Sequence, residues 1–157
     1  KSVFDIIQFR VKDAYFLDLF AGVGSVGIEA LSRGAAKCVF AELAKTSLDL
    51  IKHNINALGY NDRASIVRCD IIKDFELLSG KYDIIFMGPP YKDSCKKPLA
   101  LTQPSLQNVV KYGVLKDDSI LIVQKHIKEP VGAVLGLERF RTEKYGDTEV
   151  YFYRRAK

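Results

Sequence analysis

The segment LDLFAGVGSVGIEA, residues 17–30, determines how the rest of the chain is interpreted. It joins an apolar, β-rich run to a helical pattern through Gly22, Gly24 and Gly27, which are spaced as GxGxxG. Glycines at such a turn let the backbone bend tightly and approach a ligand without Cβ atoms in the way, and the following helix offers free N–H groups. The GxGxxG spacing alone is a weak indication of a ligand site. The position of the glycines between a strand and a helix strengthens it and predicts a nucleotide-like ligand beside this loop.

The segments around this loop alternate between strands and helices. Short apolar runs rich in β-forming residues predict strands buried on both faces at residues 15–20, 37–42, 64–69, 82–87 and 119–124. Helical patterns cover residues 25–32 and 45–58, the second ending at Gly59, and residues 2–9 predict an apolar helix that packs on the sheet. Strands that alternate with helices form a parallel sheet with right-handed crossovers.

The C-terminal region follows a different pattern. The runs LERFRTEKY and EVYFYRR flank a short turn, Gly146–Thr148, which is typical of an antiparallel hairpin. We find no internal repeat, low-complexity tract or linker that would divide the chain. The sequence therefore predicts an α/β fold in a single domain, residues 1–157, whose mostly parallel sheet ends in an antiparallel hairpin.

Composition narrows the class of protein. With 48% hydrophobic and 27% charged residues, the chain is neither disordered nor fibrous, and its apolar runs are too short to cross a membrane. Its first residues lack a signal-peptide pattern, so we expect a soluble cytoplasmic protein without membrane contact. Cys38, Cys69 and Cys95 are widely spaced without a CxxC pair, which predicts reduced thiols and no metal site. A net charge of +5 favours a polyanionic partner, although a merely basic surface explains it equally well.

Three carboxylates end predicted strands near the glycine loop. Glu42 lies 20 residues beyond Gly22, where a carboxylate can accept both hydroxyls of a ribose, as in a dinucleotide or in S-adenosylmethionine. Asp18 favours the second ligand, because an anion suits amino and sulfonium charges better than a pyrophosphate. Asp70 could accept a hydrogen bond from an adenine amine while Ile71 lies against the ring.

Each of these carboxylates also has a purely structural interpretation. Asp18 could cap amides of the loop, and Glu42 could be an ordinary charge at the end of a strand. Asp70 could cap the segment that begins at Ile71, because Asp is common at helix starts. Only the agreement between the three positions favours a ligand site.

The segment FMGPPYKD, residues 86–93, interrupts the fourth predicted strand. Pro89 and Pro90 fix φ and remove N–H donors, which leaves rigid backbone carbonyls as hydrogen-bond acceptors. Tyr91 could stack on a base that has left its helix. A simple turn is the alternative, because Gly and Pro commonly end strands. Since the segment follows a strand on the same sheet edge as the glycine loop, we favour a base-binding site.

These segments together resemble the RsmD family of class I S-adenosylmethionine-dependent methyltransferases, which methylate a guanine-N2 amine of 16S ribosomal RNA. The similarity rests on FLDLFAGVGSVGIEALSRGAAKCVFAE (16–42), NINALGY (54–60), DRASIVRCD (62–70), the strand before Pro89 and KYGDTEVYFYRR (144–155), and it covers nearly the whole chain. The resemblance implies a Rossmann-like fold with a seven-stranded sheet and helices on both faces.

The resemblance also implies the ligands and the site. S-adenosyl-L-methionine would be the cofactor, with S-adenosyl-L-homocysteine as product, and small-subunit ribosomal RNA or an assembled 30S-type particle the partner of a monomeric enzyme. The implied cofactor-binding residues are Asp18, Phe20, Gly22, Gly24, Ser25, Glu42, Leu43, Asp70 and Ile71. The implied catalytic residues, where the target guanine would lie, are Gly88, Pro89, Pro90 and Tyr91.

The chain departs from the family pattern in two places. The family has Asp or Asn before Pro-Pro-Tyr or Pro-Pro-Phe, whereas this chain has Gly88, so one acceptor for the target amine is missing. Gly88 is compatible with a weakened but competent enzyme, with an engineered or erroneous residue, or with a protein that binds RNA without efficient turnover. We also expect the basic N-terminal hairpin of family members to be absent, either because the sequence starts late or because those residues do not exist, and its RNA contacts would be lost with it.

Basic residues follow two predicted strands on the ligand side of the sheet. Lys92, Lys96 and Lys97 follow the fourth, and Lys125, His126 and Lys128 follow the fifth. We expect contacts with RNA phosphates, with solvated charged loops as the alternative. Neither His53 nor His126 has a nucleophile or metal-spaced partner, so neither is assigned a catalytic role.

Three other functions compete with the one that the resemblance implies. An NAD-dependent oxidoreductase would explain the glycine loop and Glu42 but not the Pro-Pro-Tyr turn. A non-catalytic RNA-binding module would explain Gly88 and the positive charge. An adenine-N6 methyltransferase acting on DNA or RNA would use the same type of turn.

Overall fold

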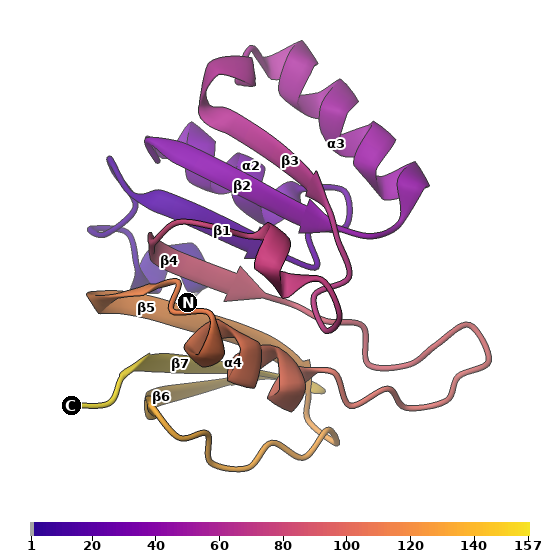
Figure 1. Cartoon of the computed structure of the whole chain (residues 1–157), viewed down its shortest axis with the longest axis vertical. Helices are drawn as coiled ribbons and strands as arrows, with labels where there is room; N and C mark the ends of the chain where they lie inside the picture. Colours follow the sequence, from indigo (N-terminus) through magenta and orange to yellow (C-terminus); the bar gives the residue numbers. More distant parts are fainter. Residues whose placement is uncertain (1) are drawn as a thin grey trace.

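The computed structural model describes residues 2–157 and contains a seven-stranded sheet with the strand order β3-β2-β1-β4-β5-β7-β6 (Figure 1). The strands are β1 (Tyr15–Leu19), β2 (Lys37–Glu42), β3 (Ala64–Arg68), β4 (Tyr82–Met87), β5 (Leu115–His126), β6 (Leu137–Tyr145) and β7 (Thr148–Arg155). Strands β1 to β5 are parallel, and β7 pairs antiparallel with both β5 and β6. The predicted parallel sheet with its terminal hairpin is confirmed.

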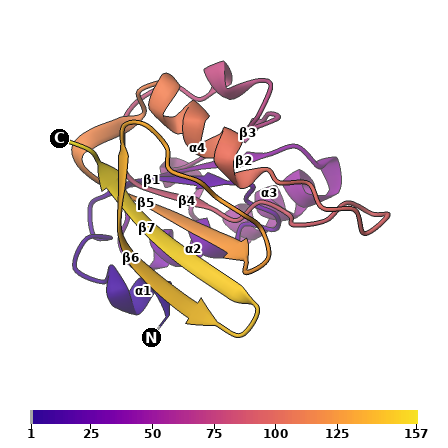
Figure 2. The same cartoon turned by 90° about the horizontal axis from the view of Figure 1, so that it is seen from below.

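Helices cover both faces of the sheet (Figures 1 and 2). The helices are α1 (Val3–Ile6), α2 (Ser25–Ser32), α3 (Lys45–Leu58) and α4 (Thr102–Lys111), with single 3₁₀ turns η1 (Asn61–Arg63) and η2 (Phe75–Leu77). Buried side chains of α1, α2 and α3 pack on one face, and those of α4 and η2 pack on the other. The predicted arrangement of helices is therefore also confirmed.

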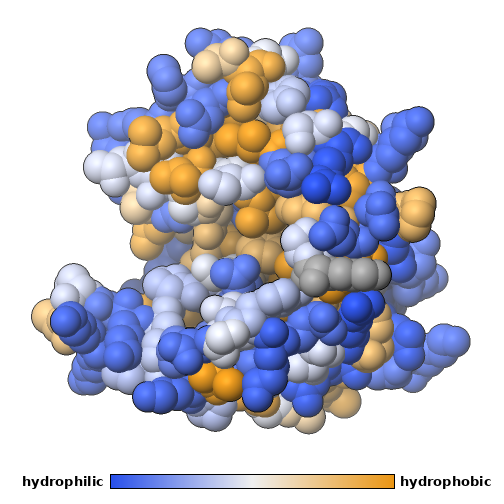
Figure 3. Space-filling model, turned by 180° about the vertical axis from the view of Figure 1, so that it is seen from behind, coloured by the Kyte–Doolittle hydropathy of each residue, from blue (hydrophilic) through white to orange (hydrophobic). Residues whose placement is uncertain are grey.

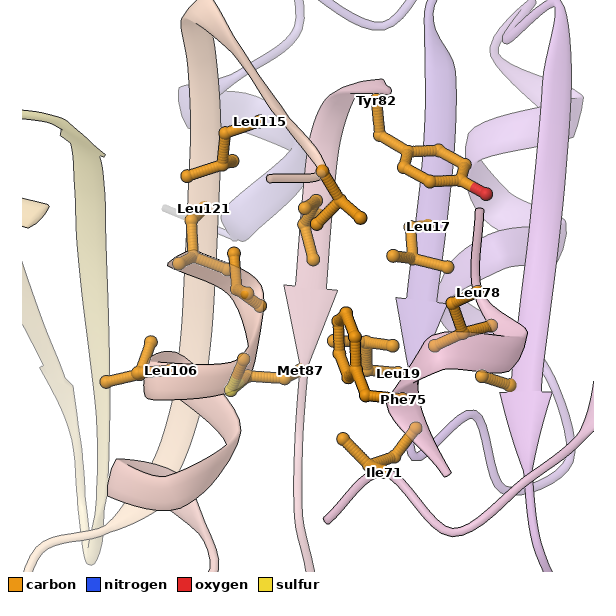
Figure 4. Close-up of a cluster of buried hydrophobic side chains, with 14 of the residues drawn as sticks. Leu17, Leu19, Ile71, Phe75, Leu78, Tyr82, Met87, Leu106, Leu115 and Leu121 are labelled. Atoms are coloured by element: carbon orange, nitrogen blue, oxygen red, sulfur yellow. The ribbon is translucent and has the colours of Figure 1, made fainter. Parts of the chain in front are cut away.

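Alternation along the central strands explains the two-sided core. Successive side chains of a strand point to opposite faces, so a strand covered on both sides reads as a continuous apolar run. Leu17 and Met87 belong to the cluster beneath α4 and η2, where they lie near Phe75 and Leu106 (Figure 4). Phe16 belongs to the opposite cluster, beneath α1 to α3.

The structure differs from the predictions in three elements. Strand β5 covers Leu115–His126, whereas residues 119–124 were predicted, so His126 belongs to the strand. The first helix covers only Val3–Ile6 of the predicted residues 2–9, and Phe9 is exposed. Helix α4 was not predicted, because Pro104 and the polar residues around it hide its apolar positions; Pro104 lies in the first turn, where proline is tolerated. Within residues 2–157, no helix combines the length and hydropathy that a bilayer crossing requires.

The order of strands places the ends of β1 and β4 side by side. Strand β1 pairs with β2 on one edge and with β4 on the other, so the crossovers from β1 and β4 leave in opposite directions. In open parallel sheets, ligands bind in the crevice at the carboxyl ends of strands where the order reverses. The glycine loop after β1 and the turn after β4 meet at this edge.

Gly27 shows why the third glycine of the loop is needed. It lies on the buried face of α2, and an added Cβ would lie 2.3 Å from Phe40 Cε1 and 2.6 Å from Cys38 Sγ. Both partners belong to the adjacent strand β2. This glycine serves close packing of α2 on the sheet.

Gly27→Ala should therefore destabilise the protein. Overpacking a dense core costs about 1–3 kcal/mol, which we expect to outweigh the roughly 1 kcal/mol that alanine gains over glycine in a helix. Urea unfolding followed by circular dichroism measures the change. Gly88→Ala is the matched control, because its Cβ would lie at an ordinary 3.4 Å from Phe86 Cε1. Equal free energies of unfolding for Gly27→Ala and the wild type would contradict this role.

Candidate functional site

A pocket of about 490 Å³ lies at the carboxyl ends of the central strands. Its size falls in the range of small-molecule sites, and its walls are mainly apolar. The lining residues come from five segments: Phe20, Glu42, Leu43, Ala44, Cys69, Asp70, Ile71, Ile72, Lys73, Pro90 and Leu101. Phe20, Glu42, Leu43, Asp70, Ile71 and Pro90 are among the residues predicted from the sequence. Distant segments of the chain thus form one cavity.

The segment that begins the glycine loop reaches the pocket through Phe20. Phe20 adopts a φ of 57°, unusual for a residue with a side chain, and lines the pocket. Gly22 and Gly24 have φ values of 59° and 87°, and Gly24 precedes the first residue of α2, Ser25. Gly22, Gly24 and Ser25 do not line the pocket themselves. Their cofactor contacts stay predictions.

Glu42 connects two loops at the pocket wall. Its Oε1 accepts a hydrogen bond from the Gly22 N–H at 2.8 Å, and its Oε2 accepts from the N–H groups of Leu43 and Ala44 at 2.9 and 2.8 Å. A carboxylate offers about four lone-pair sites, so Oε1 retains one for a ligand. One hydroxyl can bind there without loss of an existing hydrogen bond.

Asp18 lies behind the loop and is only 1% exposed. Its Oδ2 accepts a hydrogen bond from the Gly27 N–H at 3.0 Å, and the residue does not line the pocket. Burial raises the pKa of Asp18 to about 8, the Gly27 hydrogen bond opposes this rise, and the negative charge of Glu42 adds to it. This geometry matches the alternative interpretation, in which Asp18 holds a backbone amide.

Asp70 and Ile71 line the pocket after β3. Asp70 Oδ1 accepts hydrogen bonds from the N–H groups of Ile72 and Lys73 at 2.9 and 3.1 Å, which is the predicted capping alternative. In the described part of the chain, Asp70 Oδ2 has no hydrogen-bond donor, so this oxygen is available to a ligand. Ile71 is buried and Leu43 is half exposed, and both line the pocket, which leaves two apolar side chains for a planar ring.

The turn after β4 brings its residues to the same edge. Gly88 and Tyr91 are half-buried, Pro89 is buried, and Pro90 is exposed and lines the pocket. A Cβ on Gly88 would meet only Phe86, at 3.4 Å, so the backbone there accommodates a side chain. Gly88 is therefore not required by sterics or by a positive φ.

The loop that follows Tyr91 projects from the molecule and carries the predicted lysines (Figures 1 and 2). Asp93 organises its tip, because Oδ1 accepts hydrogen bonds from the N–H groups of Cys95 and Lys97, both at 2.9 Å. Lys92, Lys96 and Lys97 are exposed, and the projection is mostly hydrophilic when seen from behind (Figure 3). The loop presents an ordered positive surface.

The prediction for Lys125 is wrong. Its side chain is 1% exposed and forms an ion pair with Glu149 at 3.0 Å, so it cannot serve as a surface contact for phosphate. The sequence around Lys125 does not indicate this ion pair, because Glu149 lies on another strand, β7. Lys128 is exposed, as expected.

Sequence reasoning missed several residues of the site. Ala44, Cys69, Ile72 and Lys73 adjoin predicted residues and could have been found by extending each segment. Leu101 comes from the far end of the projecting loop, and no local signal marks it. The His126 ring lies against Tyr91, with ring centroids 4.2 Å apart.

The site has the features of a nucleoside-binding pocket. Two carboxylate oxygens are open to hydroxyl or amine donors, apolar walls suit a purine, and Pro90, which lines the pocket, directly precedes the Tyr91 ring. Residues 2–157 include no group of three or more His, Cys, Asp or Glu side chains that could hold a metal ion. This arrangement suits transfer between a bound nucleoside cofactor and a second planar ligand.

Comparisons with known proteins agree with this interpretation. The model of the Conserved hypothetical protein 95 family matches residues 1–154. YlbH of Bacillus subtilis (strain 168), a candidate rRNA methyltransferase by name, is 30% identical over 99% of this chain and 83% of YlbH. Ribosomal RNA small subunit methyltransferase D of Buchnera aphidicola subsp. Acyrthosiphon pisum is 26% identical over 98% of this chain and 77% of that protein.

A solved structure supports the fold. The candidate methylase of Haemophilus influenzae superposes with a TM-score of 0.84 and 23% identity, over 99% of this chain and 94% of the other. The Rossmann-like methyltransferase fold implied by the sequence is therefore confirmed.

The raised pKa of Asp18 predicts a pH-dependent stability. The folded protein holds this proton up to about pH 8, whereas the unfolded chain releases it near 3.8. The free energy of unfolding contributed by Asp18 therefore falls as pH rises through this window, by at most about 1.4 kcal/mol per pH unit. Asp18→Asn removes the titration.

Urea unfolding at pH 5 and pH 7 tests this expectation. From pH 5 to pH 7, the free energy of unfolding of the wild type should fall by about 1–3 kcal/mol relative to that of Asp18→Asn. Asp62→Asn changes an exposed carboxylate and should follow the wild type. Parallel pH dependences of the wild type and Asp18→Asn would show that Asp18 is ionised in both states.

Proposed function

The chain belongs to the Conserved hypothetical protein 95 family, and from this premise we propose that it is an S-adenosylmethionine-dependent methyltransferase of ribosomal RNA. We further propose that the acceptor is the exocyclic N2 amine of a guanine in 16S RNA and that residues 1–157 act as one methyltransferase domain. The observation that carries the proposal is the convergence of the glycine loop, Glu42, Asp70 and the Pro-Pro-Tyr turn at one sheet edge.

The pocket residues fit S-adenosylmethionine as cofactor. We assign a ribose hydroxyl to the open site on Glu42 Oε1 and the adenine amine to the open Asp70 Oδ2. The adenine ring would lie between Leu43 and Ile71, and the loop from Phe20 to Ser25 would face the methionine part. Asp18 would act from behind the loop, where its buried carboxyl holds the start of α2 through the hydrogen bond from the Gly27 N–H. The bound cofactor supplies an electrophilic methyl group and leaves as S-adenosylhomocysteine.

The turn after β4 would present the acceptor base. The turn would hold the amine nitrogen in line with the methyl group that S-adenosylmethionine supplies, with S-adenosylhomocysteine as the leaving group, and the methylated amine would release its proton to solvent water. The Pro89 carbonyl would accept a hydrogen bond from the amine and stabilise its developing positive charge. Tyr91 would stack on the base, which contributes about 1–3 kcal/mol.

Gly88 leaves this acceptor set incomplete. An Asp or Asn side chain at this position would accept the second hydrogen of the amine. By analogy with loss of one oxyanion-hole donor, the missing acceptor should slow transfer by about 10²–10³-fold. We therefore expect slow but measurable activity from this chain.

The partner would be small-subunit RNA, free or in a 30S-type particle. Exposed Lys92, Lys96, Lys97 and Lys128 form a positive rim beside the proposed base site and would contact phosphates. We also propose that the enzyme is a cytoplasmic monomer. An adenine-N6 acceptor is the alternative within the same chemistry, because the turn would accept either exocyclic amine; nucleoside analysis of the methylated RNA distinguishes the two.

A methyl-transfer assay on unmodified small-subunit particles tests the proposal. Gly88→Asp should raise the rate constant by about 10²–10³-fold over the wild type, because it adds the missing acceptor. Gly88→Ala adds a Cβ without an acceptor and should leave the rate at the wild-type level. If neither the wild type nor Gly88→Asp transfers a methyl group while S-adenosylhomocysteine binds, the chain is an RNA-binding relative without this activity.

A further inference from the structure

The rings of Tyr91, which follows β4, and of His126, the last residue of β5, form a stacked pair at the carboxyl edge of the sheet. Their centroids lie 4.2 Å apart and their planes are inclined by only 7°. The two strands are parallel neighbours in register at Met87 and Val123, so residues a few positions further along each strand meet naturally. The stack therefore follows from the sheet and not from a chance contact of surface side chains.

The His126 side of the stack is firmly held. Its Nδ1 accepts a hydrogen bond from the Lys128 N–H at 3.1 Å, which orients the ring. Its backbone carbonyl accepts hydrogen bonds from Lys125 Nζ at 2.9 Å and from the Glu129 N–H at 3.0 Å. Both the ring and the backbone of His126 are thus fixed.

The C-terminal hairpin supplies this support. Lys125 is buried and pairs with Glu149 of β7, and the Ile127 N–H donates to the Asp147 carbonyl at 2.7 Å. Asp147 lies in the turn between β6 and β7. His126 therefore connects two segments that are far apart in the sequence, the hairpin turn at residues 146–149 and the Pro-Pro-Tyr turn at residues 89–91.

We propose that His126 is a positioning residue for Tyr91 and that the two rings form a preformed platform on which the target base stacks as a third layer. The proposal rests on the proposed function, since it names the residue that prepares the acceptor site. A ring that is already ordered binds a base without the cost of immobilising its own side chain. The Lys92 ammonium lies over the Tyr91 ring, 5.6 Å from its centroid, so the base would displace this side chain from the ring, and its charge would then be free to contact a phosphate of the same nucleotide.

Kinetics in the Gly88→Asp background test the platform. His126→Ala should raise KM for the RNA about 2- to 10-fold, which corresponds to ordering one side chain on binding, and should change kcat by less than about twofold. His126→Phe keeps an aromatic ring and should restore KM. His53→Ala changes the other histidine, which is exposed on α3, and should leave both constants unchanged.

A binding measurement separates this proposal from the enzymatic one. Fluorescence anisotropy with a labelled, guanine-containing single-stranded oligoribonucleotide needs no methyl transfer. Its Kd should rise about 2- to 10-fold in His126→Ala and return in His126→Phe, while the Kd for S-adenosylhomocysteine stays constant. An unchanged RNA affinity in His126→Ala, or equal losses in the Ala and Phe variants, would overturn the platform whatever the activity.

The stack itself is visible by NMR because the chain has only two histidines. In a His53→Gln background the remaining imidazole signals belong to His126, and Tyr91→Leu should shift them downfield by removing the ring current. Signals that do not move would show that the rings are not stacked in solution, and would overturn the proposal.

Discussion

The crevice between the carboxyl ends of β1 and β4 is the constraint on which the rest of the molecule depends. Because β1 continues through α2 to β2 on one side and β4 continues through α4 to β5 on the other, the two crossovers leave in opposite directions and a crevice lies between the strand ends. The pocket, the glycine loop and the Pro-Pro-Tyr turn are consequences of this arrangement. Leu17 and Phe16 are buried on opposite faces of the sheet, beneath the helices that cover each face. The crevice therefore opens at the edge of the sheet and not on one of its faces.

The carboxylates at this edge combine structural and ligand roles. Backbone amides occupy Oε2 of Glu42, part of Oε1, and Oδ1 of Asp70, which orients both side chains before any ligand arrives. The open oxygen on each carboxylate can accept a hydrogen bond from a ligand hydroxyl or amine without further reorganisation of the side chain. In this sense the site is preformed. Asp18 differs because it is fully buried, and its carboxyl holds the start of α2 through the Gly27 N–H.

Much of the fold and part of the site could be predicted from the sequence because both depend on local patterns. Apolar strands, GxGxxG and the proline turn are visible in contiguous residues, and they locate Glu42, Asp70 and Tyr91. Leu101, His126 and the Lys125–Glu149 pair depend on contacts between segments that are distant along the chain. Local sequence held no signal for the partner of Lys125, so the buried ion pair was mistaken for a surface charge.

The central claim is that the pocket between Glu42 and Asp70 binds S-adenosylmethionine in preference to a dinucleotide. Isothermal titration calorimetry with S-adenosylhomocysteine and with NADH tests it directly, since product binding does not depend on Gly88 or on RNA. The account predicts saturable binding of S-adenosylhomocysteine at one site per chain, weakened in Glu42→Ala, and no binding of NADH. Saturable binding of NADH without binding of S-adenosylhomocysteine would contradict it.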